Sequence, residues 1–170
     1  SPGEFISIFE KNGFIINLDK YIFQKVCENV NEMKKEFKEI PKISVNISKE
    51  SLANNNFLME YEEFIKKYNI MSEEIEFEIT ERTTVSEDID IQNVLKEISK
   101  KGFCIAIDDF GTGYSSLNML ETLPIDTLKI DKSFIDKINI KEDNKSLIEA
   151  IMFTSQKLHL KTVAEGVETI

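Results

Sequence analysis

The sequence predicts an α/β fold of the (β/α)-barrel type, in which parallel strands alternate with helices. Short apolar strand patterns alternate with amphipathic helical patterns through most of the 170 residues, which is typical of parallel strands joined by right-handed crossovers. Each predicted strand also has one bulky apolar face and one small or polar face, whereas an open doubly wound sheet should be apolar on both. About five strands are predicted, fewer than the eight that close a barrel.

The predicted elements begin with two helices and then alternate. Ser1 and Pro2 begin a short helix that Gly13 ends, Asn17 is expected to cap a long helix, and Pro41 ends that segment. The later elements are predicted as strand 43–48, helix 52–68, strand 75–81, helix 86–102, strand 103–109, helix 115–121, strand 128–131, helix 143–158 and strand 162–165.

Composition indicates a single folded domain over residues 1–170. Hydrophobic residues make up 41% and charged residues 31% of the chain, and no linker or repeat divides it. No apolar run approaches the roughly 20 residues needed to cross a bilayer, so no membrane contact is expected from this segment. Cys27 and Cys104 form no CxxC pair, which favours a reduced, cytoplasmic setting.

The charge balance narrows the class of partner. The net charge is −10, from 31 acidic and 21 basic residues. This net negative charge argues against duplex nucleic acid as a binding partner, because binding it requires a basic face. A small phosphodiester remains compatible with an acidic pocket when divalent cations lie between the two.

Polar side chains gather late in the predicted strands, where the active sites of barrels are built. Because every second residue of a strand shares a face, parity places one polar residue of each strand on the same side. Several carboxylates buried together require cations, and oxygen ligands favour Mg²⁺ or Mn²⁺ over zinc. One acid alone would more often simply face solvent, but the set favours a metal site. Its predicted members are Asn46, Glu78, Asp108, Asp109, Lys129 and Glu165.

Several segments resemble the EAL family of cyclic di-GMP phosphodiesterases. They are PGEFISIFEKNGFI at the start, SVNIS at 44–48, EITE at 78–81, DDFGTGYSSL at 108–117, LKID at 128–131 and AEGVE at 164–168. The resemblance runs the length of the chain, and the long DDFGTGYSSL segment is its most specific part. It implies a modified (β/α)₈ barrel and metal-assisted opening of cyclic di-GMP to the linear dinucleotide.

The resemblance also implies a role for each metal ligand. Asn46, Glu78 and Asp108 resemble the ligands of one metal. Asp108 and Asp109 resemble the pair that serves a second metal, with Asp108 bridging the two. Mg²⁺ or Mn²⁺ is therefore the expected cofactor.

Further roles are implied around these ligands. Lys129 matches the lysine that contacts the attacking water, and Glu165 matches a general base or second-metal ligand. Glu81 matches the glutamate that steadies the loop at 111–114. Glu168 matches a position near the substrate.

We expect the EAL-type domain to be incomplete in this chain. The strand carrying the EAL tripeptide would precede Ser1, and the last strands would follow Ile170. The fragment is then expected to be weakly active or inactive, and strands 43–48 and 162–165 to be edges that favour a homodimer. A silent cyclic di-GMP receptor and a pure dimerisation or signalling module remain alternatives.

Overall fold

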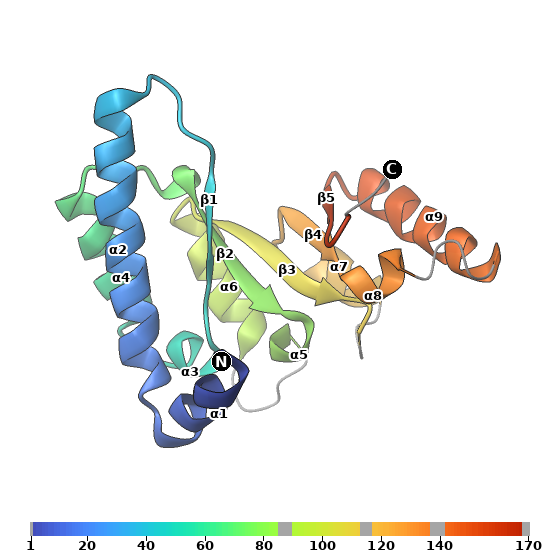
Figure 1. Ribbon diagram of the computed structural model, residues 1–170, viewed down its shortest axis with the longest axis horizontal. Coiled ribbons are helices and arrows are strands. Elements are labelled where there is room, and N and C mark those ends of the chain that lie inside the picture. Colours follow the sequence, from blue (N-terminus) through green and yellow to red (C-terminus); the bar gives the residue numbers. More distant parts are fainter. Residues whose placement is uncertain (1, 85–89, 113–116, 137–141, 168–170) are drawn as a thin grey trace. The chain divides into compact units, whose positions relative to one another are not determined.

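The computed structural model describes residues 2–84, 90–112, 117–136 and 142–167. The chain divides into two compact units (Figure 1). Unit 1 comprises Ser1–Phe77 and Glu97–Cys104, and unit 2 comprises Glu78–Lys96 and Ile105–Ile170. The described strands form one sheet in the order β1-β2-β3-β4-β5. Strands β2 (Ile75–Thr80) and β3 (Cys104–Phe110) contribute residues to both units.

Unit 1 holds the first helices and β1. Helix α2 packs on α1, α3, α4 and β1. The bounds are α1 (Pro2–Asn12), α2 (Ile15–Glu36), β1 (Ile43–Asn46), α3 (Lys49–Leu52), α4 (Phe57–Lys67) and a 3₁₀ turn, η1 (Ser72–Glu74). Helix α6 (Ile91–Lys100) supplies its last residues to this unit.

Two helix boundaries in unit 1 differ from prediction. Helix α2 begins at Ile15, so Asn17 lies inside the helix instead of capping it. The reason is local: Gly13 turns the chain with φ +74°, and the Phe14 N–H donates to Asn12 Oδ1 at 2.9 Å. The helix predicted over 52–68 begins later, at Phe57 of α4, and a separate short helix, α3, ends at Leu52. The Ser48 side chain caps α3 by accepting from the Ser51 N–H.

An aromatic cluster fills the core of unit 1. The ring of Phe77 on β2 is fully buried, and ring centroids of Phe23, Phe57, Tyr61 and Phe103 lie 5.7, 5.6, 5.8 and 4.9 Å from it. Tilted and edge-on pairs at such separations stabilise a core beyond the area they bury. Helices α2 and α4 are therefore held to the sheet mainly by aromatic packing.

Strand β2 is buried on both faces, which is more than the alternation of its sequence predicts. Phe77 lies on its apolar face, but Glu76 and Glu78 on the polar face are also only 8% and 9% exposed. Glu76 accepts from Ser44 Oγ at 3.2 Å and lies 3.8 Å from Lys42 Nζ. The polar face is thus buried because its carboxylates have partners within the protein.

Unit 2 contains the second part of the sheet. Strand β4 (Thr127–Ile130) pairs in parallel with β3 and with β5 (Lys161–Ala164). Its helices are α5 (Glu81–Thr84), α7 (Leu117–Thr122), α8 (Lys132–Ile135) and α9 (Glu142–Lys157), together with the first turns of α6. Ile105, Ile107 and Leu128 are fully buried, whereas all of β5 is exposed.

The described elements agree with the predicted α/β class. Five strands alternate with helices, and the pairings of β4 are parallel. The predicted helix start at Ser86 lies outside the described residues. Among the described helices, none is long and apolar enough to cross a membrane.

Candidate metal centre

The centre of the site is the ammonium group of Lys129 on β4. Its Nζ lies 3.0 Å from Glu78 Oε1 on β2, 2.9 Å from Asp108 Oδ1 on β3 and 2.8 Å from Glu165 Oε1, directly after β5. All four residues belong to unit 2. The ammonium group of Lys129 thus contacts three carboxylates, one on β2, one on β3 and one directly after β5.

Strand parity and pairing explain why these residues meet. Neighbouring parallel strands align their carboxyl ends, and side chains of like parity share a face. Lys129 pairs with Val163, and the Glu165 N–H continues the ladder by donating to Ile130 O at 3.0 Å. Successive strands therefore deliver one polar side chain each to the same end of the sheet.

The environment of Lys129 keeps it charged. Burial alone would lower the pKa of this ammonium, since its side chain is only 14% exposed. Hydrogen bonds to Glu165, Asp108 and Glu78 outweigh burial, and the pKa of Lys129 is raised above its ordinary value. Lys129 is therefore a permanent positive charge at neutral pH.

Three carboxylates in this unit are close enough to share a cation. Ligand oxygens of Asp108, Asp109 and Glu165 all lie within 4.8 Å of one another. Partial burial raises the pKa of Asp109, and the negative charges of the neighbouring carboxylates Asp108, Asp131 and Glu165 raise it further. The positive charge of Lys129 acts in the opposite direction. Crowded carboxylate oxygens without sulfur or imidazole suit a hard cation such as Mg²⁺ or Mn²⁺. The donor set therefore fits the metal that the sequence predicts.

Asp108 and Asp109 are consecutive, and a regular strand would point them to opposite faces. Two irregularities allow them to share a site. The β3–β4 register shifts between Ile107 and Phe110, and Asp109 has a left-handed φ of +54°. The Asp109 N–H also donates to Asp108 Oδ1 at 3.0 Å. Such a conformation costs an aspartate about 1–2 kcal/mol, which the surrounding structure must offset.

The turn after β3 is held by Glu81. This residue, the first of α5, is only 3% exposed, and its Oε2 accepts from the Gly111 N–H at 2.9 Å. This contact is compatible with the predicted role of Glu81 as the residue that steadies the loop at 111–114. Gly113 and Tyr114 of that loop lie outside the described residues.

Two further residues, Asn46 and Glu168, belong to the predicted site. Asn46 is the last residue of β1 and is exposed in unit 1. Glu168 lies outside the described residues. Asp131, by contrast, had no predicted role, yet its charge acts on Asp109 and its side chain caps α8 by accepting from the Ser133 N–H. Parity with Lys129 was the signal that could have found it.

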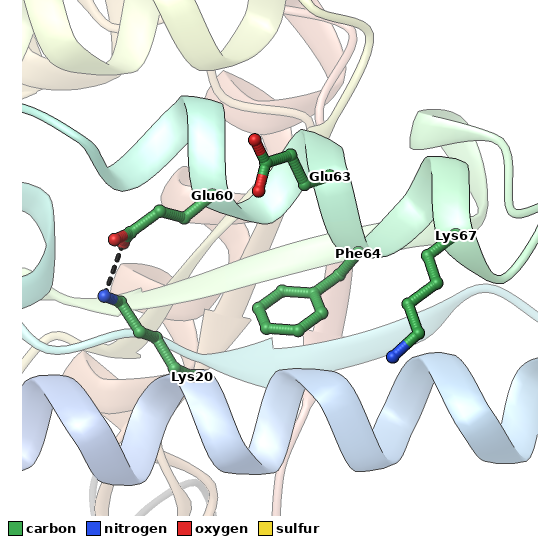
Figure 2. A pocket seen from close by; sticks show the side chains of 5 residues that line it. All are labelled: Lys20, Glu60, Glu63, Phe64 and Lys67. Carbon is green, nitrogen blue, oxygen red and sulfur yellow. Dashed lines mark ion pairs between the residues drawn. The ribbon is translucent and has the colours of Figure 1, made fainter.

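A hollow of about 250 Å³ lies on unit 1 between α2 and α4 (Figure 2). Its charges are of both signs, and Lys20 pairs with Glu60 at 2.6 Å across it. No predicted site residue is among the described residues that line it, which are Lys20, Glu60, Glu63, Phe64 and Lys67. It offers no cluster of like charge, so the carboxylates of unit 2 remain the candidate site.

Comparison with known proteins identifies the family. The EAL domain family matches residues 1–170. The chain is 35% identical over 167 residues to the signaling protein YkoW of Bacillus subtilis, covering 98% of this chain and 21% of that protein. It is 34% identical over 168 residues to the cyclic di-GMP phosphodiesterase NbdA of Pseudomonas aeruginosa, covering 99% and 22%. The chain thus spans about a fifth of the length of these two relatives.

Solved structures agree with the sequence matches. The PaMucR phosphodiesterase in complex with c-di-GMP superposes with a TM-score of 0.92 at 32% identity, covering 99% of this chain and 68% of that chain. The EAL enzyme Bd1971, in its cAMP and cyclic-di-GMP bound form, gives a TM-score of 0.91 at 28% identity, covering 99% and 47%. With these matches along its whole length, the chain belongs to the EAL domain family.

Proposed function

We propose that the protein carrying this sequence is a metal-dependent phosphodiesterase that hydrolyses cyclic di-GMP to the linear dinucleotide. The observation that carries the proposal is the cluster in unit 2, where Asp108, Asp109 and Glu165 can share a cation beside the charged Lys129. The names of relatives support the substrate, since NbdA is a cyclic di-GMP phosphodiesterase and PaMucR was solved with c-di-GMP.

In this proposal the carboxylates of Asp108, Asp109 and Glu165 hold Mg²⁺ or Mn²⁺, and the family resemblance adds Glu78 and Asn46 as ligands. Bound cations lower the pKa of a water molecule and stabilise charge on the phosphodiester. Lys129 balances the charge of the carboxylates and orients the attacking water.

Three further residues have roles in the proposed mechanism. Glu165, the most exposed of the carboxylates around Lys129, accepts the proton of the attacking water at a carboxylate oxygen. Glu81 holds the turn that follows the aspartates, and Glu168 contacts the substrate. The last role rests on the resemblance alone.

Hydrolysis of cyclic di-GMP with Mg²⁺ or Mn²⁺ by the whole protein that carries this sequence tests this function. We expect Asp108→Asn and Glu165→Gln to remove most of the activity, by roughly 100-fold or more, since each removes a charge that a two-metal site needs. Glu149→Gln on α9, where the carboxylate is 66% exposed, is the matched control and should retain activity. Full turnover by Asp108→Asn, or by the wild type in excess chelator, would rule the mechanism out.

The same experiment separates the alternatives. Binding of cyclic di-GMP without hydrolysis by the wild type would favour a silent receptor. Absence of both metal binding and nucleotide binding would favour a dimerisation or signalling module. The three carboxylates around Lys129 are the reason that we place hydrolysis first.

We also propose a homodimer in a reducing, cytoplasmic setting. The exposed strand β5 leaves backbone groups available for pairing. Helix α9 exposes Leu147, Met152 and Phe153, which would favour burial against a second copy. Cys27 and Cys104 are free thiols, which is compatible with reducing conditions.

A further inference from the structure

The turn that follows β3 is held by hydrogen bonds and by an aromatic ring. The buried Glu81 carboxylate accepts the Gly111 N–H, and Asp109 O accepts from the Thr112 N–H at 3.2 Å and from Thr112 Oγ1 at 3.0 Å. The ring of Phe134 lies against the Gly111 α-carbon. A Cβ added to Gly111 would lie 2.5 Å from Phe134 Cε2, 2.8 Å from Cζ and 2.9 Å from Cδ2. The ring therefore occupies the space that any other residue at position 111 would need.

Phe134 is also tied to this turn through its own helix. Helix α8 starts directly after Asp131, and the Phe134 N–H donates to Asp131 O at 3.0 Å. The Asp131 N–H in turn donates to Phe110 O at 3.4 Å, across the β3–β4 pair. The ring is thus attached to the strand end that carries the aspartates, and it is half-buried there.

We propose that Phe134 is a positioning residue for the metal-binding aspartates, an inference that rests on the proposed function. The Glu81 hydrogen bond fixes the Gly111 N–H, and the Phe134 ring fills the space beside the Gly111 α-carbon. Together they hold the left-handed conformations of Asp109 and Gly111, at φ +54° and +101°, and so keep Asp108 and Asp109 on one cation.

Residue 111 must be glycine for two separate reasons. A φ of +101° disfavours any side chain, and the ring leaves no room for one. The first ground does not depend on Phe134, whereas the second does. A double substitution can therefore separate them.

The test is Mn²⁺ affinity, measured by calorimetric titration of the full chain. Residues that support metal ligands typically change affinity by about 10–100-fold when removed, so we expect Phe134→Ala to weaken Mn²⁺ binding within that range. Phe134→Leu, which refills part of the space, should recover most of the loss. Phe37→Ala removes an aromatic ring that is 56% exposed in unit 1 and should leave the affinity unchanged.

A cycle with Gly111→Ala gives the sharper result. Gly111→Ala should weaken Mn²⁺ binding more in the wild type than in the Phe134→Ala background, where the steric conflict is gone and only the backbone strain remains. Equal effects in both backgrounds, or wild-type affinity for Phe134→Ala, would overturn the inference. Where Phe134→Ala does not fold by circular dichroism, the cycle is run with Phe134→Val, whose short side chain also removes the steric conflict, and equal effects of Gly111→Ala there would overturn the inference as well.

The proposed function can fail separately. Asp108→Asn is measured in the same titration. Unchanged Mn²⁺ affinity in Asp108→Asn refutes the metal site itself. Weaker binding in Asp108→Asn together with wild-type affinity in Phe134→Ala refutes only the role of Phe134.

Discussion

Phe77 and Glu78 are neighbours on β2, yet their side chains enter opposite surroundings in different units. The Phe77 ring in unit 1 lies among four other aromatic rings with no solvent exposure. The Glu78 carboxylate in unit 2 is nearly as buried, but its partner is an ammonium group. One face of β2 is therefore stabilised by aromatic packing and the other by an ion pair. Substitutions on the two faces should change the free energy of unfolding for different reasons.

The largest expected effect on stability is at Phe77. Phe77→Ala leaves a cavity inside the aromatic cluster and should lower the free energy of unfolding by about 3–5 kcal/mol, measured by urea denaturation. The Mn²⁺ affinity of the folded fraction should not change, because the Phe77 and Glu78 side chains lie on opposite faces of β2. Phe37→Ala, at an exposed ring of the same unit, should cost less than about 0.5 kcal/mol. Equal losses of unfolding free energy in the two variants would show that the aromatic cluster does not stabilise unit 1.

A smaller effect, dependent on metal, is expected at Lys129. Lys129→Gln leaves three carboxylates without their shared cation and should cost about 3 kcal/mol, the lower end for breaking a buried ion pair. Added Mn²⁺ should recover much of this loss, because a bound cation replaces the missing charge and stabilises the folded state.

Thermal unfolding with and without Mn²⁺ checks this, with Lys145→Gln as the control. Lys145 is 69% exposed and pairs only loosely with Glu149, at 4.0 Å, so little change is expected there. A Lys129→Gln deficit that is the same with and without Mn²⁺ would mean that packing, not charge balance, explains the role of Lys129.

The chain should self-associate through the exposed edge of unit 2, whereas the packed interior of unit 1 should take no part. We expect light scattering across a dilution series to show a dimer. Val163→Lys, a charge on the exposed strand β5, should raise the dissociation constant about tenfold, or roughly 1.4 kcal/mol. A wild type that stays monomeric at micromolar concentration would show that neither β5 nor α9 is an interface.

The smallest effect is expected at Glu28 on α2. Hydrogen bonds from Lys25, Gln24 and Tyr68 lower the pKa of Glu28 from 4.5 to about 2. Because the pKa of Glu28 is lowered in the folded state, its ionised carboxylate stabilises the fold at pH values above the pKa of the unfolded state. This contribution is lost as pH falls toward about 2. In Glu28→Gln, acid titration of stability should show a shallower slope in that window. An unchanged slope would show that these contacts are not formed in solution.

Strand parity predicted much of the site, because it depends only on local geometry. It assigned Glu78, Asp108 and Lys129 to one face, and the structure brings them within ion-pair distance. Parity could not join Asp109 to that face, since the register shift of β3 arises from pairing with β4. Asp109 was predicted as a member of the acidic set at the strand ends, although its parity differs from that of Asp108.

The misplaced helix boundaries and the missed residues have similar causes. Asn17 is a good capping residue, but the turn at Gly13 starts α2 earlier. Phe134 reads as an ordinary apolar residue of a short helix, and only the folded chain shows its ring against Gly111. Contacts between residues distant in sequence decide both a strand irregularity and a steric support, and no local pattern encodes them.

The central claim is that the carboxylates of unit 2 form a metal site, and Mn²⁺ titration of the chain tests it most directly. We predict saturable Mn²⁺ binding by the wild type and a loss of at least about 100-fold in affinity for Asp108→Asn, since removing a ligand should cost no less than removing a residue that supports one. Glu149→Gln should bind as the wild type does. Equal Mn²⁺ affinity in the wild type and Asp108→Asn, or no binding by either, would contradict the account.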